Sequence, residues 1–161
     1  MATRAEKDAC DLLDADHKAV KKLFNAYEEL AGSRARSAAG KKLDLARQIC
    51  RELTVHAQIE EEIFYPALRA ALKDTAVVAE AEVEHQGAKD LIAQIEAADE
   101  TDEMFDAKVK VLGENIDHHV KDERTDMFPK ARAARKLDLI ALRDALQARK
   151  EELMAQMEAP A

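Results

Sequence analysis

The sequence is poor in the residues that build sheets, tight turns and cross-links. Its 161 residues include no tryptophan, three prolines, four glycines and two cysteines, and only 4% are aromatic. This scarcity argues against an all-β or α/β fold, while the abundance of Ala, Leu, Glu, Lys and Arg favours helices. A chain of this length is expected to form one domain with a sizeable core.

Positive charge and long apolar runs are also scarce. The formal net charge is −8, which argues against binding to nucleic acid or to an acidic membrane. No segment approaches the ~20 apolar residues of a membrane span, and the N-terminus lacks a signal-peptide pattern, so we expect a cytoplasmic protein. Cys10 and Cys50 have no Cys or His at ligand spacing, and we expect reduced thiols without a role in function.

Apolar residues recur at helical spacing in five segments, at about 8–31, 41–72, 76–98, 102–127 and 138–157. Pro66 is expected to kink the second helix and Pro129 to end the fourth, which Thr101 or Asp102 can cap. The short loops predict an all-α fold, an up-down-up-down antiparallel four-helix bundle over residues 1–130. Residues 131–161 are predicted to form an additional C-terminal amphipathic helix that packs on the bundle or on a second subunit of a homodimer.

Two stretches share one spacing: HAQIEEEIFYP at 56–66 and HVKDERTDMFP at 119–129. Each begins with His, has Glu four residues later, and ends with an aromatic residue followed by Pro. Residues i and i+4 share a helix face, so each pair can direct an imidazole and a carboxylate at one point. On the other two helices, DHKAVK (16–21) and EHQGAK (84–89) repeat an acid-His-x-x-x-Lys pattern. The chain therefore contains the same set of His and Glu positions twice.

Counted from the loops, these residues lie within about one helical turn of a common depth. Four imidazoles and two carboxylates in one layer favour two first-row transition metals such as iron or manganese, with both Glu bridging the metals. The alternative is that each His–Glu pair is an ordinary surface ion pair and the repeat concerns folding only. The predicted layer comprises His17, His56, Glu60, His85, His119 and Glu123.

The neighbours of this layer have other expected roles. Glu61 and Glu62 are expected to face solvent or to contact the metal ligands without binding the metals themselves. Lys21 and Lys89, each four residues after a lone histidine, are candidates for positive charges close to the metal ligands. The acids that precede the lone histidines, Asp16 and Glu84, could orient neighbouring groups, but we expect them on solvated helix faces. Tyr27 and Tyr65 could lie near the metals, but we expect them to pack in the core.

With these motifs the chain resembles the hemerythrin family, in its HHE cation-binding branch. The resemblance covers about residues 8–130 and rests on DH (16–17), HAQIEEEIFYP, EH (84–85) and HHVKDERTDMFP (118–129). It implies a non-haem centre of two iron ions with an oxo or hydroxo bridge, bound by the six residues inside the bundle; manganese is an alternative metal. The oxygen carriers space their last His and carboxylate by five, as His118 and Glu123 are, whereas the i+4 repeat favours His119.

One departure from the oxygen carriers bears on function. They have a further His four residues after the third-helix His, where this chain has Lys89. The resemblance therefore implies a cytoplasmic protein that binds or reacts with O2, NO or peroxide under oxidative or nitrosative stress, with catalase- or peroxidase-like turnover if it is an enzyme. The alternative is an iron- or oxygen-sensing module without turnover. A ferritin-like carboxylate site is disfavoured, because such sites use Glu-x-x-His pairs.

Overall fold

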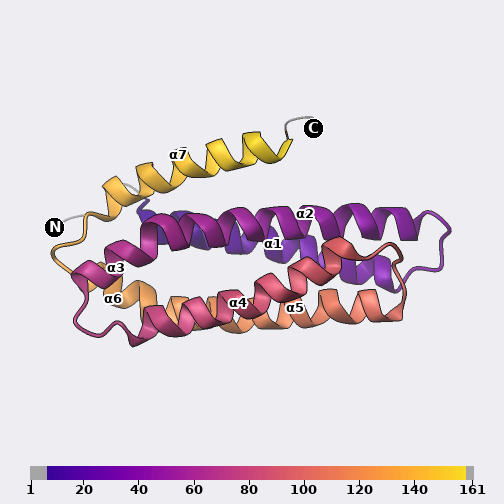
Figure 1. The fold of residues 1–161 in the computed structure, drawn as a ribbon, viewed down its shortest axis with the longest axis horizontal. Coiled ribbons are helices and arrows are strands. Elements are labelled where there is room, and N and C mark those ends of the chain that lie inside the picture. The colour runs from indigo at the N-terminus through magenta and orange to yellow at the C-terminus, as the bar shows by residue number, and fades with distance from the viewer. Residues whose placement is uncertain (1–6, 159–161) are drawn as a thin grey trace.

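In the computed structural model, residues 7–158 are described, and every regular element in that range is helical (Figure 1). Four long helices form the bundle: α1 (Ala9–Ala31), α2 (Ala38–Ile59), α4 (Ala76–Ala97) and α5 (Glu103–Asp122). They run alternately up and down and are joined by short loops. The predicted all-α bundle with an additional helix is confirmed.

Side-chain caps define where two of these helices begin. Asp8 accepts a hydrogen bond from the Asp11 backbone N–H at 3.0 Å, while the Asp11 carboxylate accepts one from the Asp8 N–H at 2.9 Å. This reciprocal capping box satisfies two backbone donors at the start of α1. At α5 the cap is Asp102, which accepts from the Phe105 N–H at 2.9 Å, and not Thr101.

Neither α2 nor α5 ends at its proline. Each passes into a five-residue π-helical turn, η1 (Glu60–Phe64) or η2 (Glu123–Met127), and then into a short helix, α3 (Tyr65–Ala71) or α6 (Phe128–Ala133). The Tyr65 N–H donates to the Glu60 carbonyl, and the Phe128 N–H to the Glu123 carbonyl, one residue further than in an α-helix.

Proline explains the wider turn. It lacks an N–H, and its ring collides with the carbonyl four residues earlier, so α-helical winding cannot continue unchanged. Pro66 and Pro129 sit in the first turn of α3 and α6, where a missing donor costs little. The prediction that Pro129 ends its helix is wrong, and Pro66 produces a π turn.

The C-terminal helix α7 (Leu139–Glu158) lies along the outside of the bundle against α1 and α2 (Figure 1). Its Leu146 and Leu153 are buried, and Leu139 and Leu142 are partly buried against the same core. Met157, at the end of the predicted apolar stripe, is exposed. The helix therefore packs on its own bundle, while the division of the chain at residue 130 stays a prediction.

The core consists of two apolar clusters. One surrounds Leu13, Ile59 and Leu68 near α3, α6 and α7, and the other surrounds Ile49, Phe105 and Leu112 towards the opposite end of the bundle. Each cluster contains one free, buried cysteine, Cys10 or Cys50. Across residues 7–158, no helix has the length and apolar character that crossing a membrane requires.

Candidate metal centre

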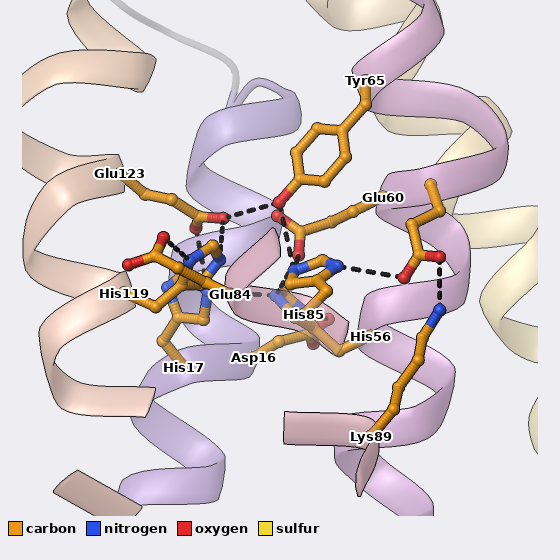
Figure 2. Close-up of polar contacts among 11 residues, drawn as sticks. Asp16, His17, His56, Glu60, Tyr65, Glu84, His85, Lys89, His119 and Glu123 are labelled. Atoms are coloured by element: carbon orange, nitrogen blue, oxygen red, sulfur yellow. Dashed lines mark hydrogen bonds and ion pairs between the residues drawn. The ribbon is translucent and has the colours of Figure 1, made fainter. Parts of the chain in front are cut away.

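Between the two apolar clusters lies a layer of charged side chains that points into the bundle (Figure 2). It contains four imidazoles and two carboxylates, each at most 6% exposed. The two carboxylates are the most deeply buried, at 0% for Glu60 and 1% for Glu123. The structure thus brings together all six residues that the sequence placed in one layer: His17, His56, Glu60, His85, His119 and Glu123.

The six side chains form two overlapping groups that share both carboxylates. One consists of His17 and His56 with Glu60 and Glu123, the other of His85 and His119 with the same two glutamates. Within each group the facing nitrogen and oxygen atoms lie within 4.8 Å of one another. This arrangement is consistent with a binuclear metal site in which the carboxylates lie between the two positions.

Glu60 and Glu123 each face both halves of the layer. Glu60 Oε1 lies 3.2 Å from the Nε2 atoms of both His56 and His85. Glu123 lies 3.1 Å from His17 Nε2 through Oε2 and 2.7 Å from His119 Nε2 through Oε1. Each carboxylate therefore contacts one imidazole from each group.

These close approaches leave several atoms without a hydrogen bond. Both oxygens of Glu60, Oε2 of Glu123 and Nε2 of His119 are buried and have no aligned hydrogen-bond partner. A buried carboxylate without such a partner is costly in a protein interior unless a cation compensates it. The geometry therefore fits atoms that converge on metal positions better than a hydrogen-bonded polar network.

Carboxylates also support the outer nitrogen of three of the histidines. His56 Nδ1 lies 3.0 Å from Asp16, His119 Nδ1 lies 2.8 Å from Glu84, and His85 Nδ1 lies 3.0 Å from Glu61. An N–H donated outward fixes the ring orientation and leaves the Nε2 lone pair facing inward, as metal-binding histidines require. Asp16 and Glu84 were expected on solvated faces, and the structure corrects that expectation.

These supports follow the sequence repeat and then depart from it. The acid before each lone histidine contacts the histidine of the His-x-x-x-Glu pair in the same half of the layer. Asp16 contacts His56 in this way, and Glu84 contacts His119. Glu61 follows Glu60 and supports His85, but the residue that follows Glu123 is Arg124, which donates to Asp14 instead. His17 Nδ1 has only a 3.7 Å approach from Asp14 and no hydrogen bond.

The negative charge of the layer strongly stabilises positive charge within it. Burial by itself lowers the pKa of His56, but Glu60 and Asp16 outweigh burial and hold that pKa well above its usual value. For His119 burial acts in the same direction, and Glu123 outweighs it, with Glu60 and Glu84 adding to the effect, to raise the pKa to about 9. Surroundings that hold a proton on an imidazole also attract a metal cation.

Tyr65 packs in the first core cluster, as expected, and its hydroxyl also reaches the layer, which was the alternative for this residue. Its hydroxyl lies 3.1 Å from His85 Nε2 and donates to Glu123 Oε1 at 3.2 Å (Figure 2). Burial, with Glu60 and Glu123 nearby, raises the pKa of this hydroxyl well above its usual value. At the equivalent position of the repeat, the Phe128 ring stacks on His17 with centroids 6.4 Å apart. Tyr27 packs in the other core cluster and donates to Asp106.

The adjacent histidines 118 and 119 have different surroundings. His119 is 5% exposed within the layer, whereas the His118 side chain is 70% exposed and lies near Asp122 and Glu84. Of the two lysines that follow the lone histidines, Lys89 donates to Glu61, and Lys21 pairs with Asp117 at the surface. Only Lys89 is therefore connected to the layer, through Glu61 and His85.

A cavity of about 610 Å³ reaches the layer between α2, α4 and α5. All four histidines of the layer line it, together with apolar residues of the bundle such as Leu53, Ile92 and Val120. Glu61, Glu84 and Lys89 also contribute to the lining. A small molecule therefore has a route to the polar layer.

Comparison with known proteins agrees with the fold. A solved structure described as a hemerythrin HHE cation binding domain-containing protein, the Rv2633c homolog from Mycobacterium kansasii, superposes with a TM-score of 0.74 at 23% identity and covers 94% of this chain and 90% of its own. This likeness establishes the fold. A protein named DNA nickase from Nostoc sp. (strain PCC 7120 / SAG 25.82 / UTEX 2576) is 28% identical over 118 residues, 73% of this chain. The chain spans about a third (32%) of that relative's length.

The sequence pattern of one family covers most of the chain. The Hemerythrin HHE cation binding domain matches residues 8–131, which include the four bundle helices and every residue of the buried layer. The chain therefore belongs to the hemerythrin HHE cation-binding domain family.

Proposed function

We propose that the protein binds two iron ions in the buried layer and uses them to bind or react with O2, NO or peroxide. His17 and His56 would hold one ion, His85 and His119 the other, and Glu60 and Glu123 would bridge them. The observation that carries this proposal is the position of Glu60: it is fully buried, contacts one imidazole of each group, and has no hydrogen bond at either oxygen.

The donor atoms favour iron or manganese among the common metals. A layer of imidazoles and carboxylates suits iron or manganese, whereas structural zinc sites usually contain thiolates and calcium sites require oxygen ligands. Cys10 and Cys50 lie in the apolar clusters, and burial raises the pKa of each thiol to about 12. They are therefore poor candidates for thiolate ligands. Manganese has the same donor preferences and remains the alternative metal.

Reactivity with a small molecule is supported by the cavity and by Tyr65. Bound iron would supply Lewis acidity, electron transfer and positions for a small ligand. The cavity provides the approach, and apolar side chains such as Leu53, Ile92 and Val120 form part of its wall. The Tyr65 hydroxyl, 3.1 Å from His85 Nε2, offers a proton donor inside the layer. If turnover occurs, we expect it to be catalase- or peroxidase-like.

A sensing function without turnover is the second candidate. It is favoured by the connection of α7 to the layer through Asp16, which accepts a hydrogen bond from Lys150 of α7 at 2.6 Å and one from His56 at 3.0 Å. Metal or ligand binding would then alter how α7 packs, and a partner would detect that change. We do not extend nickase activity to this chain, whose net charge of −8 opposes contact with DNA.

Metal content tests the centre. Native protein is expected to contain about two iron atoms per chain by elemental mass spectrometry, and Glu60→Ala and His119→Ala are expected to lose one or both. His118→Ala is the matched control, because its side chain is outside the layer, and it should retain the full content. Equal iron in all variants, or a single zinc that is indifferent to Glu60, would disprove the binuclear centre.

Peroxide turnover then separates the two functions. Catalytic release of O2 from H2O2 by the iron-loaded protein, lost in Glu60→Ala, supports an enzyme. Tight reversible binding of O2 or NO without turnover supports the sensing module. Failure to bind or react with any of these molecules would leave a metal centre and refute the proposed reactivity.

A further inference from the structure

The C-terminal helix α7 provides a cation that reaches the buried layer through one intervening carboxylate. Lys150 Nζ donates to Asp16 Oδ1 at 2.6 Å, and Asp16 Oδ2 accepts from His56 Nδ1 at 3.0 Å. The participating side chains are mostly buried, at 28% exposed for Lys150 and 12% for Asp16, and His56 is buried. The three groups form a continuous chain from α7 through α1 to α2.

Within residues 7–158, a bond from α7 to the acid before the lone histidine occurs in only one half of the repeat. The other half has a lysine–carboxylate–histidine chain of its own, Lys89–Glu61–His85, but that chain does not involve α7. Glu84 is the counterpart of Asp16 and supports His119, but its second oxygen has only the exposed His118 at 3.8 Å. No lysine contact with Glu84 is recorded among residues 7–158. The lysine on Asp16 therefore distinguishes the His17/His56 group from the His85/His119 group.

A second contact of α7 supplies an internal comparison. Arg149 donates to Glu62 from Nε at 3.0 Å and from Nη2 at 3.2 Å. Glu62 lies in the π turn but faces away from the layer and supports no histidine. Loss of the Arg149 contact therefore loosens α7 without removing a bond in the chain to His56.

We propose that Lys150 is a positioning residue for the His17/His56 metal position, acting through Asp16 on the orientation of His56. This rests on the proposed binuclear centre. A carboxylate held on both oxygens has a fixed plane, and a fixed carboxylate holds the imidazole ring that donates to it. Lys150 lies outside the matched family segment, residues 8–131, so the C-terminal helix completes a site that the family segment begins.

The test is cobalt binding to the metal-free chain of 161 residues, followed by chelator competition. Direct carboxylate partners of metal-bound histidines typically contribute ~10–100-fold to affinity. Asp16→Asn should weaken one of the two cobalt affinities and Glu84→Gln the other, which assigns the two positions. Lys150→Gln should weaken the position assigned by Asp16→Asn by about three- to tenfold, Lys150→Arg should restore most of the loss, and Arg149→Gln should change neither affinity.

Two further readouts distinguish positioning from a general loss of stability. In the cobalt-loaded protein, the hyperfine-shifted Nδ1–H resonance that disappears in Asp16→Asn should move in Lys150→Gln and stay in place in Arg149→Gln. In an Asp16→Asn background, Lys150→Gln should have no additional effect on affinity, because the intervening group is gone.

The outcomes separate the two proposals. A wild-type chain that binds fewer than two cobalt ions would refute the binuclear centre and this inference with it. Two cobalt ions bound with affinities that Lys150→Gln leaves unchanged, weakens equally or strengthens would refute the positioning role alone. An equal effect of Arg149→Gln would show that only the docking of α7 matters, which also refutes it.

Discussion

At the scale of single residues, the two halves of the metal layer differ at Tyr65 and Phe128. Both residues follow a π turn, and both rings pack against the lone histidine of a bundle helix, at 5.3 Å from His85 and 6.4 Å from His17 between centroids. Of these two rings, only that of Tyr65 carries a hydroxyl that can donate a proton. The two proposed metal positions are therefore chemically different.

Tyr65→Phe should retain both metal ions and lose reactivity. The substitution removes a proton donor 3.2 Å from Glu123 Oε1, but none of the six proposed ligands. We expect peroxide turnover to fall by about 100-fold or more, in line with typical general-acid contributions, and metal content to stay unchanged. Steady-state kinetics on metal-matched samples measures the effect.

Tyr27→Phe is the control for this experiment. It removes a hydroxyl that donates to Asp106 at 2.7 Å, and it lies in the cluster at the other end of the bundle. Its turnover should equal that of the wild type. Equal losses in both variants would show that Tyr65 acts on the stability of the bundle and not on the chemistry.

The six layer residues were predictable from the sequence because their positions follow from helix geometry. A His and a Glu four residues apart share a face wherever the helix lies, and the repeat made the pairing specific. The supporting residues depend on contacts between helices. Asp16 and Glu84 are acids on helix surfaces like many others in this chain, and only the packing of the bundle shows that they reach histidines on neighbouring helices.

At the scale of elements, a π turn explains how Tyr65 reaches the layer as well as the core. In an α-helix, residues i and i+5 point about 140° apart, so Tyr65 should not share the direction of Glu60. The π turn from Glu60 to Phe64 contains one extra residue. Tyr65 therefore lies about one full turn after Glu60, and its side chain points towards the layer. The two prolines indicated that the α-helix is interrupted near them. They did not indicate whether a kink, an end or a π turn would result.

The glycines in α4 and α5 give a prediction about helix stability. Gly87 lies inside α4, and a Cβ at this position would meet no atom within 4 Å. Gly87→Ala should therefore raise the free energy of unfolding by about 0.5–1 kcal/mol, the usual gain in helix propensity. Urea denaturation of the metal-free protein measures the change.

Gly113 in α5 is the contrasting position. A Cβ there would lie 3.1 Å from Cδ1 of Phe24 in α1, so the Phe24 ring must move to admit it. Gly113→Ala should raise the free energy of unfolding clearly less than Gly87→Ala does, or should lower it. An equal gain for both would mean that the contact between α1 and α5 adjusts at no cost.

Asp8 at the start of α1 predicts a pH effect on stability. Burial raises its pKa, but the hydrogen bonds from Arg132 and the Asp11 N–H outweigh burial, so the folded-state pKa lies below its ordinary value. Such a group stabilises the fold above its unfolded pKa of about 4, and this contribution disappears as the pH falls through the folded pKa.

Asp8→Asn isolates this charge, because Asn caps a helix about as well as Asp. The variant should melt below the wild type at pH 7, and the difference should narrow below about pH 4. Thermal melts over this range measure it. A difference that is constant with pH would show that the carboxylate charge contributes nothing.

At the scale of the whole molecule, the polar layer interrupts what would otherwise be one continuous core. Two buried carboxylates without complete hydrogen bonding lie between the apolar clusters. Such a layer is unfavourable in the absence of a compensating cation. The all-α bundle was predictable from composition and spacing, but the packing of α7 on its own bundle was not, because an amphipathic stripe does not specify its partner.

Metal binding should therefore stabilise the entire fold. A ligand present at ~1,000 times its Kd adds about 4 kcal/mol to the free energy of unfolding. We expect iron or cobalt to raise the melting temperature of the wild type and of His118→Ala, and chelation to reverse this. Glu60→Ala should melt at a temperature that added metal changes little. A metal-induced shift in Glu60→Ala as large as in the wild type would contradict this role of the carboxylate.

The bond between Lys150 and Asp16 has a consequence for the order of events during synthesis. The two residues are separated by 134 positions, so at ~5–20 residues per second the ribosome adds Lys150 roughly 7 to 27 s after Asp16. Residues 17, 56 and 60 emerge first, followed by the second half of the layer and finally α7. A newly made chain thus has all of its candidate ligands before the last helix has joined the bundle. Iron delivered early would meet a His56 whose supporting carboxylate is still free to turn, and the final helix would fix it in place afterwards.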